Sequence, residues 1–192
     1  MGKLASLNEL EDLGLNTPRL LLALGAAEEA RSKVIAWNNL KLSNRAKVSI
    51  RTENVNHGCL CPHHPNITQG KADAIIRDLV KRPGYEILIF EGIDPNDCLR
   101  RGNIVVPKDL QKGIIVEYSE GPGTVRDLNR SDFKVLEIPW MAVIPDEVRP
   151  IVLTYATHRD KLVGRILEWS IYRNPVGKLK RNEIFWEIRP WQ

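Results

Sequence analysis

Two stretches near the end of the chain decide its fold: residues 167–172 (LEWSIY) and residues 183–188 (EIFWEI). Both mix β-branched and aromatic residues with polar ones, which is typical of β-strands. Residues 174–177 (NPVG) lie between them and carry a proline and a glycine, which favour turns. The pattern therefore predicts an antiparallel hairpin at this end of the chain.

The spacing of apolar residues predicts helices before strands along the rest of the chain. Helices are predicted over residues 4–13, 19–36 and 69–81. Strands are predicted at residues 48–52, 85–90, 114–118, 133–138 and 151–156, and residues 54–68 are predicted to form a loop. Because helices come early and strands late, we expect an α+β fold with N-terminal helices and a mainly antiparallel C-terminal sheet.

The composition indicates a globular protein with its own core. The chain has 192 residues, of which 43% are hydrophobic and 27% charged. This fits a single compact domain over residues 1–192, or two small lobes at about 1–80 and 81–192. The net charge of +4 is mild, so nucleic acid is not indicated as a partner. No apolar run approaches the roughly 20 residues that span a bilayer, and we expect a cytoplasmic protein.

A cluster of cysteines and histidines occupies residues 57–64 (HGCLCPHH). Zinc favours such side chains and takes four of them in a tetrahedron. The Cys-x-Cys spacing differs from the usual Cys-x-x-Cys, however, and no second ligand pair follows in the sequence. A polar loop is therefore the favoured interpretation, and zinc in the region of Cys59, Cys61 and His63 is disfavoured.

Two carboxylates stand in the predicted hairpin. Strand alternation places Glu168 on the face opposite Trp169, and it places Glu187 on one face with Phe185 and Arg189. Carboxylates on neighbouring strands can hold Mg²⁺, which prefers oxygen ligands and is often shared with phosphates, and the arginine could bind the same phosphates. The alternative is an ordinary hairpin whose carboxylates pair with arginines at the surface. The candidate arginines are Arg165, Arg173 and Arg181.

A glycine turn follows the predicted strand at residues 114–118. Residues 117–127 (EYSEGPGTVRD) pass from an apolar strand through a glycine turn into polar residues. At the turn the backbone can approach a flat ligand closely, because glycine has no side chain. A plain hairpin connection is the alternative interpretation of the same residues.

Taken in order, these segments resemble the ATP-grasp superfamily, and most closely the nucleotide-binding domain of pyruvate phosphate dikinase and phosphoenolpyruvate synthase. The matching segments are residues 2–10 (GKLASLNEL), 14–18 (GLNTP), 48–52 (VSIRT), 116–121 (VEYSEG), 166–169 (ILEW) and 187–190 (EIRP). The sequence departs from the family pattern at Ile166, where the family has an aspartate, and at Glu187, where it has a glutamine.

The resemblance implies a compact ATP-grasp-like fold and a set of site residues. It implies ATP and Mg²⁺ as cofactors, with Lys3, Arg51 and Arg189 as catalytic phosphate contacts. It implies Glu168 and Glu187 as magnesium ligands. It places Glu117 and Tyr118 near the nucleotide, and Arg126, in the same polar segment, is a further candidate for nucleotide binding. Since the enzymes of this family are larger, it also implies a reduced protein that could depend on a partner.

Three functions are compatible with these residues. The leading hypothesis is an ATP- and magnesium-binding protein, a phosphotransferase or ligase acting on a small acidic substrate. The second is a non-catalytic relative that binds nucleotide or serves as an interaction partner, and the sequence leaves a homo-oligomer open. The third is a module for single-stranded nucleic acid, based on the basic residues 174–181 (NPVGKLKR) and their aromatic neighbours. Those neighbours are Trp169, Tyr172, Trp186 and Trp191.

Overall fold

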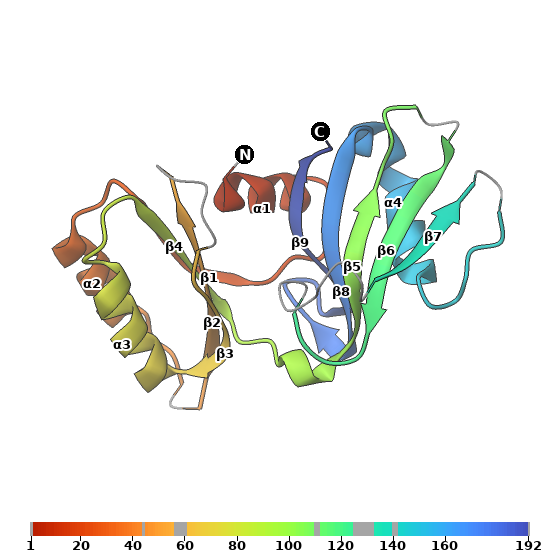
Figure 1. Ribbon diagram of the computed structural model, residues 1–192. Helices are drawn as coiled ribbons and strands as arrows, with labels where there is room; N and C mark the ends of the chain where they lie inside the picture. Colours follow the sequence, from red (N-terminus) through yellow and green to blue (C-terminus); the bar gives the residue numbers. More distant parts are fainter. Residues whose placement is uncertain are drawn as a thin grey trace. The chain divides into compact units, whose positions relative to one another are not determined.

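The computed structural model describes residues 2–43, 45–55, 61–109, 112–124, 133–139 and 142–191. The chain divides into two compact units (Figure 1). The smaller unit spans Pro18–Asp94, and the larger unit combines Lys3–Thr17 with the chain from Pro95 onward. Two chain connections therefore join the units, at residues 17–18 and 94–95.

The smaller unit is an antiparallel sheet with both of its helices on one face (Figure 1). The sheet has the strand order β1-β4-β2-β3. Its elements are β1 (Leu20–Leu24), α2 (Ala30–Asn39), β2 (Lys47–Asn54), β3 (His63–Thr68), α3 (Gln69–Leu79) and β4 (Tyr85–Glu91). Alternate strand residues point at the helices and form an apolar core. The core includes Leu24, Trp37, Val48, Ile50, Ala72, Ile76, Ile87 and Ile89.

Two charged groups of the smaller unit are held at an energetic cost. The Lys33 side chain is buried and donates a hydrogen bond to the carbonyl oxygen of Tyr85 over 3.1 Å; burial lowers the pKa of Lys33, while Glu28 opposes that shift. Glu53 and Glu86 lie directly opposite each other on β2 and β4. Burial, and then the charge of Glu53, raise the pKa of Glu86.

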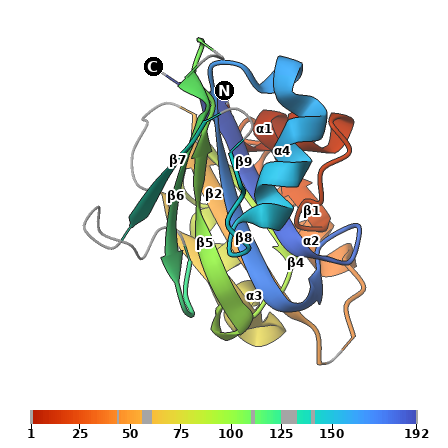
Figure 2. The same cartoon turned by 90° about the vertical axis from the view of Figure 1, so that its right-hand side faces the viewer.

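The larger unit is a five-stranded antiparallel sheet with the strand order β7-β6-β5-β8-β9. Its strands are β5 (Cys98–Val105), β6 (Ile114–Glu120), β7 (Lys134–Ile138), β8 (Arg165–Val176) and β9 (Arg181–Pro190), and its helices are α1 (Lys3–Asp12), η1 (Pro95–Asp97) and α4 (Arg149–Leu162). One face of the sheet is apolar and packs with residues of α1 and α4 (Figure 2). That core includes Leu10, Val116, Tyr118, Ile151, Leu167, Trp169 and Phe185.

The segment after α1 ties the helix to the β8–β9 hairpin. The buried Asn16 side chain donates hydrogen bonds to the carbonyl oxygens of Val176 and Glu183, over 3.0 and 2.6 Å, and accepts one from the Leu179 backbone N–H. The buried Ser6 hydroxyl accepts a further bond from the Ile188 backbone N–H over 2.6 Å. These contacts fix the hairpin against the N-terminal segment.

The predicted α+β class is confirmed, and so is the C-terminal hairpin, because β8 pairs antiparallel with β9. Three local predictions are wrong, and one strand was not predicted. The helix predicted over residues 19–36 is β1 followed by α2, and the predicted loop 54–68 contains β3. The residues predicted as a strand at 151–156 lie inside α4, and β5 is the strand for which the sequence analysis gave no prediction. In each case tertiary contacts outweigh local propensity.

The strand error at residues 151–156 has a visible cause. A run of β-branched residues suggested a strand, but Ile151, Val152 and Tyr155 are buried at helical spacing. Pro150 stands in the first turn of α4, where proline is tolerated because that N–H has no helical partner. Among the described residues, no helix combines the length and the apolar character that crossing a bilayer requires.

Gly102 is required by the close approach of β5 to β6. A Cβ atom at this position would lie 1.8 Å from the carbonyl oxygen of Glu117. We expect Gly102→Ala to lower the free energy of unfolding by about 2–3 kcal/mol, because the two strands must separate. Chemical denaturation measures this change. The matched control is Gly70→Ala in α3, where a Cβ meets nothing within 4 Å and helix propensity predicts a gain of up to about 1 kcal/mol. Equal effects of both variants would contradict this account.

The Glu53–Glu86 pair predicts a pH dependence of stability. The pKa of Glu86 is raised in the folded state above 4.5, so the folded protein binds more protons than the unfolded chain, and stability falls as the pH rises through that raised pKa. Glu86→Gln stays neutral, so it should be more stable than the wild type at pH 7, by roughly 0.2–1 kcal/mol. The gain should vanish below the unfolded pKa. Denaturation between pH 3 and 8 tests this, with the exposed Glu29→Gln as control; a gain that persists in acid would contradict it.

Candidate functional site

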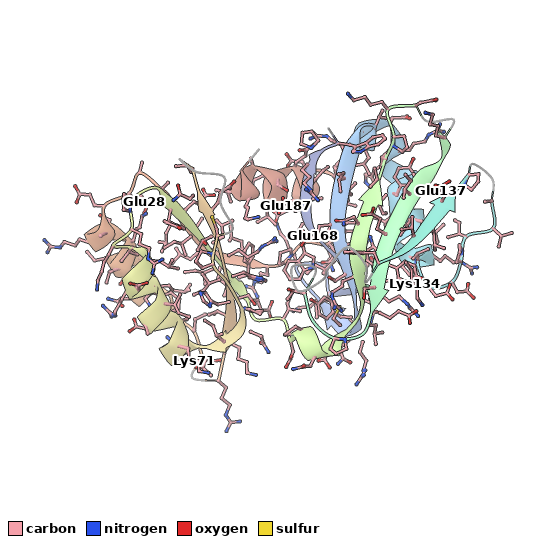
Figure 3. The ribbon with its side chains drawn as sticks, viewed as in Figure 1. Glu28, Lys71, Lys134, Glu137, Glu168 and Glu187 are labelled. Atoms are coloured by element: carbon pink, nitrogen blue, oxygen red, sulfur yellow. The ribbon has the colours of Figure 1, made fainter. Side chains whose placement is uncertain are left out.

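The second face of the larger sheet carries polar residues in register. Glu117 on β6 pairs with Asn103 on β5, Asn103 pairs with Glu168 on β8, and Glu168 pairs with Glu187 on β9. Directly paired residues point to the same face of an antiparallel sheet. These four residues therefore form one line across four strands, which we call the acidic row. Figure 3 shows the labelled Glu168 and Glu187 close together, whereas Glu137 on β7 lies at the far edge of the same sheet.

A β-bulge in β9 sets this arrangement. Trp169 pairs with Phe185, but the preceding Glu168 pairs with Glu187, so that Trp186 is one extra residue in β9. Such an insertion turns the following residues to the opposite face. Phe185 therefore points into the core, and Glu187 joins the acidic row. The prediction that Phe185 and Glu187 share a face is wrong for this reason.

The Trp186 indole stabilises the bulge. Its Nε1–H donates a hydrogen bond to the Ser170 hydroxyl over 3.0 Å. Ser170 is buried on β8 and lies two residues beyond Glu168 on the same face. The bond therefore connects the extra residue of β9 to the strand that carries the central carboxylate.

Asn103 has a side-chain oxygen that suits a cation. Its Oδ1 atom is buried and accepts no hydrogen bond, while its Nδ2 group lies 3.5 Å from Glu117 Oε2. A buried acceptor without a partner is costly, and Mg²⁺ takes amide and carboxylate oxygens at about 2.0–2.1 Å. Among the described residues, no group of three or more His, Cys, Asp or Glu side chains is placed to hold a metal. The oxygen set of Asn103, Glu168 and Glu187 nevertheless fits Mg²⁺, which commonly binds one or two carboxylates and completes its shell with phosphates and water.

Two predicted phosphate contacts lie beside the acidic row. Lys3, at the start of α1, donates to Glu187 Oε2 over 2.9 Å. Arg189 is exposed and lies two residues beyond Glu187 on the same face, where it pairs with Ile166. The larger unit thus brings together four predicted site residues, namely Lys3, Glu168, Glu187 and Arg189.

Two other predicted residues lie elsewhere or point away, and a third is not among the described residues. Arg51 belongs to the smaller unit, where it is buried on β2. The Tyr118 side chain lies in the apolar core under Lys134, whose ammonium is 5.8 Å from the ring centre, so only its backbone could face a nucleotide. Arg126 lies outside the described residues. The roles predicted for all three stay predictions.

Sequence reasoning missed two polar residues of this face, and both lie on the unpredicted strand β5. They are Asn103 and the buried Arg101, whose guanidinium donates to the carbonyl oxygens of Gly121 and Thr124. Arg101 thereby fixes the glycine turn that follows β6. The apolar run at residues 104–106 (IVV), midway between two predicted strands, was the signal that could have revealed this strand.

The structure also bears on two alternative interpretations, namely surface ion pairs of the hairpin and a nucleic-acid-binding module. Arg165 pairs with Glu9 of α1, and Arg181 lies 3.8 Å from Glu183. Trp169 and Tyr172, proposed as stacking surfaces for nucleic acid, are buried. Burial raises the pKa of Tyr172 well above its usual range. A buried ring cannot stack on a base, and this weakens the nucleic-acid interpretation.

In the Cys–His segment, the buried Cys61 thiol accepts a hydrogen bond from the Asn54 backbone N–H over 3.1 Å. His63 lies on β3, paired with Arg51 of β2. Cys59 lies outside the described residues. The interpretation that disfavours zinc here stays a prediction.

Comparison with solved structures identifies the architecture. D-alanine–D-alanine ligase from Helicobacter pylori superposes with a TM-score of 0.58 and 12% identity over 99% of this chain and 54% of that chain. The fold is the ATP-grasp fold. A D-cycloserine synthetase gives a TM-score of 0.57 and 10% identity over 98% of this chain and 61% of that chain. N5-carboxyaminoimidazole synthetase from Staphylococcus aureus gives a TM-score of 0.53 and 10% identity over 99% of this chain and 44% of that chain.

The chain spans about half the length of the solved structures it matches. No family model and no curated protein sequence matches it. At identities near 10% the comparison shows the fold alone, so the chemistry must be argued from the residues of the acidic row.

Proposed function

We propose that this protein binds ATP with Mg²⁺ over the acidic row and acts as an ATP-dependent ligase or phosphotransferase on a small acidic substrate. The observation that carries the proposal is the alignment of Glu168 and Glu187 with the unpartnered Oδ1 of Asn103. Solved structures of the same fold include amino-acid ligases by name, such as the D-alanine–D-alanine ligase. The finer likeness to the dikinases, and a cytoplasmic location, are part of the proposal.

In this proposal the side chains with oxygen ligands bind the metal, and the positively charged side chains bind phosphate. Glu168, Glu187 and Asn103 would hold the metal, which neutralises phosphate oxygens when bound. Lys3 and Arg189 would contact phosphate, since an ammonium and a guanidinium both donate to phosphate oxygens. The backbone of the strand that carries Glu117 and Tyr118 would lie near the base. The chain thereby orients phosphate groups and stabilises their charge, which is the main requirement for phosphoryl transfer.

A second candidate is nucleotide binding without turnover. Ile166 lies opposite Arg189, one alternation from Glu168 on the same face, at the position where the resembled family has an aspartate. An apolar side chain there cannot ligate a metal. An assay of ADP release in the presence of amino or carboxylic acids distinguishes the two functions. A ligase or phosphotransferase releases ADP, whereas a non-catalytic protein binds MgATP and releases no ADP.

Isothermal titration with MgATP tests the proposed site. We expect the wild type to bind, and we expect Glu168→Gln combined with Glu187→Gln to weaken binding at least about tenfold, or ~1.4 kcal/mol, since both metal carboxylates are lost. The control is Glu137→Gln, which lies on the same face of the sheet at its other edge and should bind within about twofold of the wild type.

Two results would remove the proposal. One is the absence of heat from folded wild-type protein at millimolar nucleotide. The other is an equal loss in the Glu137→Gln control, because the effect would then reflect the general charge of the face rather than these two carboxylates.

A further inference from the structure

Lys3 differs from the other charged residues through which α1 contacts the sheet. Two ion pairs join α1 to the strands and their turn, Glu9 with Arg165 and Glu11 with Lys178, and in both the helix supplies the carboxylate. In the Lys3–Glu187 pair the helix supplies the cation. Lys3 therefore brings a positive charge to a strand position that belongs to the acidic row.

The Lys3–Glu187 pair is close and partly shielded from water. The Nζ and Oε2 atoms are 2.9 Å apart, and the two side chains keep only 21% and 23% of their exposure. Partial burial strengthens such a pair relative to one at the surface. The pair also offsets a repulsion, because Glu187 lies directly opposite Glu168 and like charges on adjacent strands destabilise a sheet.

Glu187 Oε2 cannot accept a strong hydrogen bond from the Lys3 ammonium and also ligate a metal ion without weakening one of the two interactions. A divalent cation over Glu168 and Glu187 would have to displace the Lys3 ammonium from Glu187 Oε2, or share that carboxylate with it at a repulsive distance. A released lysine side chain is flexible, and it would find a new acceptor among the phosphate oxygens that a nucleotide brings.

We propose that Lys3 is an internal counter-cation of the acidic row, which competes with a bare metal ion for Glu187 and moves to phosphate when metal and nucleotide bind together. This inference rests on the proposed function, because it concerns the same metal carboxylates. Its consequence is a coupling: metal alone binds weakly, and nucleotide strengthens metal binding by giving Lys3 another partner. By linkage, metal strengthens nucleotide binding by the same factor.

Manganese binding without nucleotide tests this competition. The free Mn²⁺ signal in electron paramagnetic resonance is titrated against wild-type protein and Lys3→Met. We expect Lys3→Met to bind bare Mn²⁺ about fivefold more tightly, because the competing charge is gone. The same variant should bind MgATP more weakly, because the phosphate contact is lost. Lys3→Arg keeps the charge and should return Mn²⁺ affinity toward that of the wild type.

Lys178→Met is the matched control, since it removes a lysine that pairs with α1 away from the acidic row. It should leave Mn²⁺ affinity within about twofold of the wild type, and thermal melts confirm that all variants are folded. Equal Mn²⁺ affinity in wild type and Lys3→Met, or an equal gain in Lys178→Met, would overturn the competition and leave the metal site standing. Absence of Mn²⁺ binding by wild type, Lys3→Met and Lys178→Met alike would overturn both this inference and the metal site.

Discussion

The register of β5, β8 and β9 is the constraint on which the site depends. Side chains alternate between the two faces of a sheet, so a slip of one residue in any strand would move its whole set of side chains to the other face. The extra residue Trp186 makes one such shift within β9. It lets a single strand place Phe185 in the core and Glu187 in the acidic row.

The division of the larger sheet into an apolar and a polar face follows from that register. The core under α1 and α4 holds Leu167, Trp169 and Phe185, and burial of such side chains is the main stabilising term in folding. Their intervening neighbours are free to be polar. Gly102 serves the same arrangement, since it lets β5 and β6 approach closely and brings Asn103 into line with Glu117.

The hairpin and its carboxylates could be predicted from the sequence because alternation is a local signal. The face of Glu187 could not, since a bulge is decided by pairing with another strand. The strand β5 was missed because Gly102 and Asn103 are poor strand formers, although both are placed by contacts with β6. The run of leucines in β1 suggested a helix, and only its pairing with β4 makes it a strand. Local sequence thus predicted the hairpin that carries the two carboxylates, but neither the face on which Glu187 lies nor the strand that supplies Asn103.

The balance of charge around the acidic row indicates what kind of ligand it suits. Arg101 lies on the same face, but its guanidinium bonds to the carbonyl oxygens of Gly121 and Thr124, so it fixes the turn. A bare anion approaching the row meets the carboxylates of Glu117, Glu168 and Glu187, which repel it. A bare cation meets Lys3 at Glu187. A complex of metal and phosphate avoids both penalties, because its cation satisfies the carboxylates while its anionic oxygens accept the displaced lysine. If the acidic row is the proposed site, the arrangement therefore favours a complex of metal and phosphate over either of its parts.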